Sequence, residues 1–296
     1  MKNKKTTPKK PMSDKQFGWL LIAPLCFVLA VFMLYPTVYA VVMSFTKYLM
    51  KGTPTWIGAD NYRYILHNSE MWNSLGRTGL TVIICIVFEL VLGMLLALLL
   101  NRDFRGQGIV RGLCFMPLLI SPLAMSLIWS YILNNQYGIV NIILGWFNIY
   151  NIPWFSSVSM AKYTIMGMTI WQWLPFSTFV LLAGLKGLPK DQFEAAQVDG
   201  SSSWNTFWRL TVPTLKPLIM IIVLLRVMSL IRTYDPLYGT TRGGLGTETF
   251  DWYVYRMGFV KYDVGRGTAL GVFSLVITLL ISNVLYSQLM KALKKR

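Results

Sequence analysis

The sequence predicts an all-α integral membrane protein with six transmembrane helices and a helix–turn–helix segment between the fourth and fifth. Three observations predict it: 54% of the 296 residues are hydrophobic, only 14% are charged, and long stretches carry no charge at all. Soluble globular domains carry about 25% charged residues. The chain therefore lacks much of the polar surface that a soluble enzyme or a secreted binding domain needs.

Six runs are long and apolar enough to cross a bilayer, whose hydrocarbon core of about 30 Å needs about 20 helical residues. They are residues 18–46, 78–100, 112–133, 163–185, 213–231 and 267–290. The first is longer than the apolar core of a signal peptide, so we expect a retained anchor. Glu89 lies within the second run and Arg226 within the fifth. An ionisable residue inside a span is a functional candidate by default.

The positions of Lys and Arg predict the orientation. With the N-terminus in the cytoplasm, the inner segments hold 17 of the 28 Lys and Arg residues, whereas the outer loops hold 10 over a greater length. This is the positive-inside bias. The net charge of +16 is therefore explained by basic residues that orient the chain and contact anionic membrane lipid. Binding to nucleic acid is not needed to explain it. We expect cytoplasmic tails at 1–17 and 291–296, around a membrane domain at 18–290.

Several kinds of chemistry have no support in the sequence. Cys26, Cys85 and Cys114 lie in apolar runs without metal-type spacing, and His67, the single histidine, has no second ligand nearby. The glycine cluster at 241–247 lacks the Lys-Ser/Thr of a phosphate-binding P-loop. A membrane-embedded enzyme is therefore the weakest alternative, because no nucleophile–base pair or metal-ligand set is present.

The cytoplasmic segment 186–213 predicts a helical elbow. Pro189 suits the start of a helix and Gly200 its left-handed end. One serine of 201–203 can then cap a second short helix that carries Trp204 and its aromatic neighbours. Two explanations fit this pattern equally well: an elbow that lies on the membrane surface, and an elbow that contacts a partner protein.

The elbow also carries a recognisable motif. Glu194-Ala195-Ala196, then Asp199-Gly200 and Val212-Pro213, resemble the EAA loop of importer-type ABC permeases. Further segments resemble the carbohydrate-uptake branch of that family, of the maltose-permease F type: Trp171 to Pro175, Leu181 to Pro189, Phe115 to Asn141, and Tyr234 to Phe259. Two residues depart from the family pattern, since Leu245 replaces the proline of a usual Gly-Gly-Pro and Tyr234 replaces a common phenylalanine.

The resemblance implies a type I ABC importer fold and a transport function by alternating access. This chain and a second homologous permease subunit would form the pore, and an extracellular or periplasmic solute-binding protein would deliver a sugar or oligosaccharide. Two separate ABC ATPase subunits would hold ATP and magnesium, so this chain would carry no cofactor and catalyse no reaction. It would lie in a bacterial or archaeal cell membrane as a multi-pass protein with both termini cytoplasmic.

The resemblance also implies two sets of site residues. The ATPase contact would consist of Glu194, Ala195, Ala196, Asp199 and Gly200. The solute pathway would consist of Gln172, Trp173, Phe176, Ser229, Arg232 and Thr233 in the fourth and fifth spans. Gln172 and Phe176 are four residues apart and share one helix face, although these side chains could instead pack against lipid or a partner.

An ion-coupled secondary transporter is the alternative function. Glu89 and Arg226 motivate it, because a charge within the membrane can serve as an ion or proton site. We favour instead a structural pair, or a protonated Glu89 in a protein-lined site, because one isolated carboxylate makes a poor proton relay.

Overall fold

The computed structural model describes residues 13–294, so most of the predicted N-terminal tail and the last two residues of the C-terminal tail lie outside the described residues. Within 13–294, five helical segments are long and apolar enough to cross a membrane: Phe17–Ser44, Ser69–Leu100, Val158–Lys186, Ser203–Ile231 and Val264–Leu293. A bent pair, Gln107–Leu119 with Pro122–Ile132, supplies the sixth crossing if it counts as one span. The prediction of six spans is confirmed in this form.

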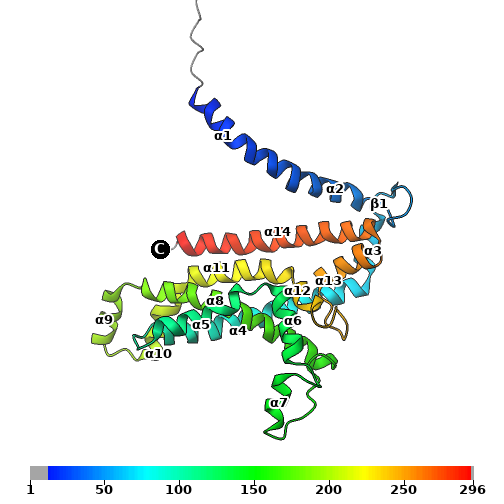
Figure 1. Cartoon of the computed structure of the whole chain (residues 1–296). Coiled ribbons are helices and arrows are strands. Elements are labelled where there is room, and N and C mark those ends of the chain that lie inside the picture. Colours follow the sequence, from blue (N-terminus) through cyan, green and yellow to red (C-terminus); the bar gives the residue numbers. More distant parts are fainter. Residues whose placement is uncertain (1–12, 295–296) are drawn as a thin grey trace, which may run out of the picture.

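Most of the first span lies away from the other helices, and its last part packs against α14 (Val264–Lys294) (Figure 1). It comprises α1 (Asp14–Leu29), the π-turn η1 (Ala30–Leu34) and α2 (Tyr35–Ser44), so the helix starts inside the predicted tail. Its most apolar 18-residue window has 0% of its residues buried by the rest of the chain. Such an apolar surface has to be covered by lipid or by another protein.

The outer connection after α2 is ordered by short elements. The strands β1 (Thr46–Lys47) and β2 (Thr55–Trp56) pair antiparallel, and α3 (Asp60–His67) follows. Asn68 then caps α4 (Ser69–Leu100), because its Oδ1 accepts from the N–H of Glu70 at 2.8 Å. His67 is exposed, and its Nδ1 lies 2.8 Å from the carbonyl oxygen of Arg63.

The third span is a bent pair of helices, and Pro122 at the start of the second helix explains the break. α5 (Gln107–Leu119) and α6 (Pro122–Ile132) meet at an angle of 101°. A residue before proline is pushed out of the helical region, and Ser121 accordingly has ψ 145° and caps α6 through its hydroxyl. The expected run 112–133 is therefore not one continuous helix.

The remaining helices complete the bundle and its two ends. They are α7 (Ile139–Gly145), α8 (Val158–Lys186), α9 (Lys190–Val198), α10 (Ser203–Thr206), η2 (Phe207–Thr211), α11 (Val212–Ile231), α12 (Asp235–Tyr238), α13 (Phe250–Tyr255), η3 (Arg256–Val260) and α14 (Val264–Lys294). The second helix of the predicted elbow is not separate, since the chain is helical from Ser203 to Ile231. The π-turn η2 ends at Thr211, two residues before Pro213, where a π-type shift of the hydrogen bonds accommodates the proline.

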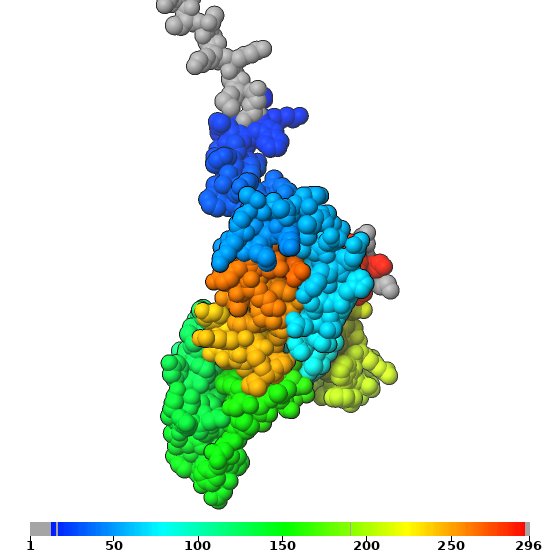
Figure 2. All heavy atoms as spheres, turned by 90° about the vertical axis from the view of Figure 1, so that its right-hand side faces the viewer, coloured from blue at the N-terminus to red at the C-terminus, as the bar shows by residue number. Residues whose placement is uncertain are grey.

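The long helices α4, α8, α11 and α14 run side by side, with α9 and α10 at one end and α3 and α13 at the other (Figure 1). α4 and α8 pack most closely where Gly93 faces Ser177, because a Cβ at Gly93 would lie 3.0 Å from that of Ser177. Figure 2 shows the end opposite the elbow, where α3 (cyan) and the α13–η3 segment (orange) lie next to each other.

Candidate functional site

The elbow turn has a fully bonded helix end. Gly200 has φ +71°, a conformation that glycine adopts without steric cost. The N–H of Ser201 donates to the carbonyl of Ala196 at 2.9 Å and that of Gly200 to the carbonyl of Gln197 at 3.1 Å. These two bonds form a Schellman motif. Ser202 then accepts from the N–H of Asn205 at 3.3 Å and caps α10, so the predicted turn chemistry is confirmed.

The predicted ATPase contact lies on the open side of this turn. Glu194, Ala195, Asp199 and Gly200 are exposed, and Ala196 is half-buried. Val198, between them, is 87% exposed, which is unusual for an aliphatic side chain at the end of a helix. The structure brings all five predicted residues together on α9 and its end.

A groove of about 1200 Å³ runs from the elbow along α4 and α11. Its floor is apolar and its rim near the elbow is polar and aromatic. The residues of the described chain that form it include Leu90, Met94, Leu98, Arg102, Phe193, Gln197, Trp204 and Trp208. Sequence reasoning did not find this groove, because it depends on where the elbow lies relative to α4.

Glu89 and Arg226 form a buried ion pair between α4 and α11. The Nε and Nη2 atoms of Arg226 donate to the two carboxylate oxygens of Glu89, each at 2.6 Å. The side chains are 0% and 2% exposed. The two residues therefore form the pair that the sequence analysis considered, and each charge is neutralised by the other.

The six predicted solute-pathway residues occupy different environments. Gln172 is buried, and its Nε2 donates to the carbonyl of Ile120 at 2.7 Å. This bond satisfies a backbone acceptor freed by the break between α5 and α6. Phe176 packs among the leucines of α8 and α11. The face of Trp173 is covered by Arg226, whose Cζ lies 4.4 Å from the ring centroid.

The other three members belong to α11 and its outer end. Ser229 accepts from Nη1 of Arg226 at 3.2 Å, and Arg232 is exposed. Thr233 is buried, and its carbonyl accepts from the Thr249 hydroxyl at 2.7 Å. The structure thus joins Trp173 and Ser229 through Arg226 but does not gather all six residues around one cavity.

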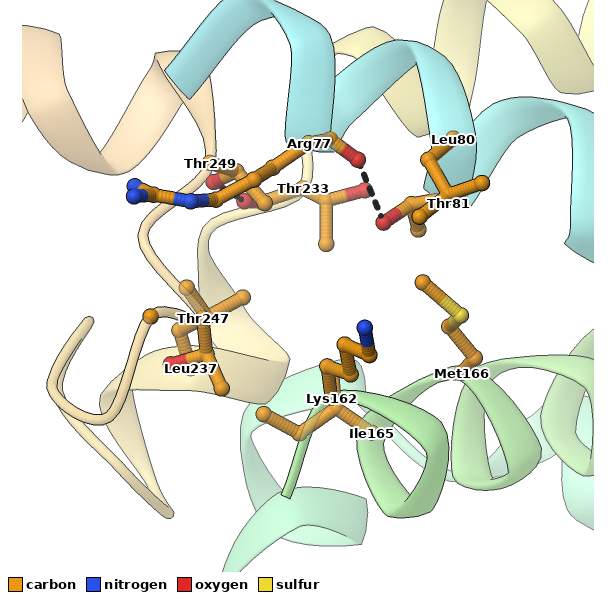
Figure 3. Close-up of a pocket in the computed structure, with 11 residues that line it drawn as sticks. Arg77, Leu80, Thr81, Lys162, Ile165, Met166, Thr233, Leu237, Thr247 and Thr249 are labelled. Carbon is orange, nitrogen blue, oxygen red and sulfur yellow. Dashed lines mark hydrogen bonds between the residues drawn. The ribbon is translucent and has the colours of Figure 1, made fainter. Parts of the chain in front are cut away.

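Thr233 lines a small cavity of about 30 Å³ at the outer ends of α4 and α8. In Figure 3 the side chain of Lys162 points across this cavity toward Thr81 and Thr233. The hydroxyl of Thr81 donates to the carbonyl of Arg77 at 2.9 Å (Figure 3). This volume suits about one water molecule, so the cavity is too small for a sugar in this conformation.

Charged groups tie together the end of the molecule that lies opposite the elbow. Arg256 pairs with Glu248 at 2.6 Å and with Glu70 at 3.1 Å, and these carboxylates raise the pKa of its guanidinium against the effect of burial. Burial raises the pKa of the Asp251 carboxyl, an effect that Arg232 opposes.

Aromatic rings pack beside these charges. Tyr234, which occupies a position of common phenylalanine, stacks on Trp252 with centroids 5.2 Å apart and meets Tyr255 at 4.8 Å. Burial and the neighbouring Tyr255 raise the pKa of Tyr234. Burial likewise raises the pKa of Tyr253 to about 12. These phenols are therefore neutral near pH 7.

Leu245 explains one departure from the family pattern. It has φ +53° in the turn that follows α12. Proline is locked near φ −65° and cannot occupy this conformation. In the described part of the chain, no group of three or more His, Cys, Asp or Glu side chains is placed to hold a metal ion.

A bundle of apolar spans with an exposed, hydrogen-bonded elbow at one end defines a polytopic membrane protein. The chain belongs to the family of binding-protein-dependent transport system inner membrane components, whose model matches residues 89–296. It is a membrane permease subunit of an ABC importer, as the EAA-type motif predicts. The family membership favours this function over ion-coupled secondary transport.

Relatives and a solved structure agree with this family. A probable ABC transporter permease of Sinorhizobium fredii is 34% identical over 83% of this chain and 81% of its own length. The trehalose/maltose transport system permease MalF of Thermococcus litoralis is 29% identical over 92% of this chain and 93% of its own. The crystal structure of a bacterial ABC transporter that imports the acidic polysaccharide alginate matches with a TM-score of 0.78 and 22% identity, covering 94% of this chain and 97% of that one. This last likeness shows the fold.

Proposed function

We propose that this chain forms one half of the pore of an ATP-driven importer for a sugar or oligosaccharide. The other half is a second homologous permease subunit, and an external solute-binding protein delivers the solute. Two ABC ATPase subunits, which hold ATP and magnesium, drive the alternation between outward-open and inward-open states. Relatives that transport trehalose and maltose support the substrate class.

The observation that carries the proposal is the exposed elbow. Its EAA-type residues lie together on α9, with Glu194 exposed on the helix and Gly200 closing it. The excess of Lys and Arg in the inner segments supports a cytoplasmic position for this elbow, which is where ATP is available. We assign Glu194, Ala195, Ala196, Asp199 and Gly200 to the ATPase contact, with Glu194 pairing a basic or hydrogen-bonding group there.

The unburied first span supports a second permease subunit. A 28-residue apolar helix with 0% of its central window buried presents a long surface that a neighbouring membrane subunit can cover by van der Waals packing. The cavity that Thr233 lines has a volume of only about 30 Å³, so a second subunit would have to complete a sugar-sized pore.

The solute path remains assigned to Gln172, Trp173, Phe176, Ser229, Arg232 and Thr233. Trp173 and Ser229 both contact Arg226 of α11, and Thr233 lies just beyond the end of α11. A second subunit would complete the cavity beside these residues. Sugar rings stack on aromatic faces and their hydroxyls bond to polar side chains, and this set supplies both kinds of group.

The test is reconstitution of the complex. The chain is co-expressed with a candidate second permease and ATPase encoded beside it, purified by a tag on this chain, and placed in liposomes with the solute-binding protein. We expect ATPase subunits to co-purify, and labelled trehalose or maltose to enter only when ATP is present. Glu194→Lys should reduce the amount of ATPase subunit that co-purifies with the chain. If the amount of ATPase and the uptake both stay at wild-type levels, the assigned contact is wrong.

A further inference from the structure

Four side chains from three helices meet at the buried centre of the bundle, and we name Glu89, Arg226, Trp173 and Ser229 the clamp. All three guanidinium nitrogens of Arg226 donate hydrogen bonds, two to Glu89 of α4 at 2.6 Å and one to Ser229 at 3.2 Å. The face of the guanidinium lies 4.4 Å from the centroid of the Trp173 ring on α8. One side chain of α11 therefore contacts both other helices.

Stability alone gives no reason for this arrangement. Removing two charges from water is costly, and well-packed apolar residues in place of a buried ion pair often give a protein at least as stable. A bidentate arginine–carboxylate pair does, however, impose a fixed geometry. The clamp consequently fixes how α4, α8 and α11 are aligned. Apolar packing of leucines would fix this alignment less strictly.

The clamp lies between the elbow and the outer end of the molecule. The elbow joins α8 to α11, and near it a Cβ at Gly184 would overlap the side chains of Leu215 and Leu218, so the two helices are in close contact there. Arg226 lies five residues before the end of α11, about 8 Å along the helix axis. Beyond that end, Thr233 bonds to Thr249 of the outer loop.

Prolines make two of these helices easy to bend. Pro175 lies inside α8 two residues after Trp173, and Pro217 lies inside α11. A proline removes a backbone hydrogen bond and is a common site of helix kinks. A displacement of the elbow could thus be absorbed by bending at Pro175 before it reached the outer end.

We propose that the clamp is a positioning device that makes α4, α8 and α11 move as one unit, so that displacement of the elbow reaches the outer end of the chain. This inference rests on the proposed function, because the displacement comes from ATPase subunits at the elbow. Glu89 and Arg226 act through the alignment of Trp173 and α11 and need no contact with solute.

Spin-label distances in the assembled complex test the proposal without knowledge of the solute. Cysteines replace Val198 of α9 and Tyr286 of α14 as an inner pair, or Trp146 and Phe259 as an outer pair; all four side chains are exposed. Cys26 and Cys114 are changed to alanine, and buried Cys85 is kept. Distances are measured with and without magnesium, ATP and vanadate.

The main variant is Glu89→Leu with Arg226→Met, which removes both charges and leaves no unpaired ion. We expect ATP to change the inner distance as in the wild type, while the fraction of complexes that show the outer change falls roughly two- to thirtyfold, the range for residues that couple distant sites. Asp60→Asn, which breaks an exposed ion pair with Arg63, is the matched control and should change neither distance.

Other outcomes overturn the inference. An outer change in the double variant equal to that of the wild type, or no outer change in the wild type, would show that the clamp transmits nothing. Glu89→Gln keeps the side-chain shape and is measured in parallel; loss of assembly in both variants would show a role in folding instead. A wild-type complex with no ATP-dependent inner change would contradict the proposed function itself.

Discussion

Gly200→Val is expected to uncouple the elbow from its ATPase partner. Gly200 has φ +71°, and a residue with a Cβ in the left-handed region costs about 1–2 kcal/mol. A Cβ placed at Gly200 meets no atom within 4 Å, so the whole effect comes from backbone strain and none from a clash. A cost of this size lowers the ratio of closed to open turn roughly 5- to 30-fold.

The strain predicts an order among substitutions. Asparagine tolerates the left-handed region better than alanine, and a β-branched side chain tolerates it least. ATPase recovery with the purified chain and ATP-dependent solute uptake in liposomes should therefore decrease from Gly200→Asn to Gly200→Ala to Gly200→Val, while the amount of chain in the membrane stays constant.

Gly271→Ala is the matched control. Gly271 lies inside α14, and a Cβ there also meets no atom within 4 Å, but its φ is not positive. Alanine in a helix interior is favoured over glycine by about 1 kcal/mol, so this variant should keep full uptake. Wild-type uptake and solute-stimulated ATP hydrolysis in Gly200→Val would refute the reasoning.

Four further predictions concern orientation and local packing. A cysteine at exposed Asn148 should react with an impermeant maleimide on intact cells, and one at exposed Ser202 should react only after lysis; the reverse pattern would invert the proposed topology. Leu245→Gly should relieve the φ of +53° and raise stability by about 1–2 kcal/mol, whereas Leu245→Pro should lower the unfolding temperature in detergent. Gly93→Val should cost about 1–3 kcal/mol by overpacking, because a Cβ there already lies 3.0 Å from the facing helix; an unchanged unfolding temperature would disprove this close packing. Burial raises the pKa of the Asp251 carboxyl, so the contribution of this group to stability is present at low pH and is lost as pH rises through the folded-state pKa. The unfolding temperature of Asp251→Asn should therefore equal that of the wild type in acid and exceed it at neutral pH. A variant less stable than the wild type at neutral pH would contradict the burial argument.

The sequence alone determined the number and order of the spans and the chemistry of the elbow turn. Hydropathy is a local property that a membrane enforces without regard to tertiary packing, so the six runs were found. Turn chemistry is local as well: a left-handed Gly200 and a capping serine among residues 201–203 follow from what glycine and serine do at helix ends, and the structure identifies that serine as Ser202. The family motif on α9 added the partner class.

Only the tertiary structure decided what the buried polar residues do. Pro117 and Pro122 were compatible with either a kink or a continuous helix, and the 101° bend is settled by Gln172 of another helix, which satisfies the freed carbonyl of Ile120. Glu89 and Arg226 are separated by 137 positions, so no local pattern could distinguish a free membrane charge from a bidentate pair. The partner of a buried polar group is set by which helices pack together, and that depends on contacts between residues far apart in the chain.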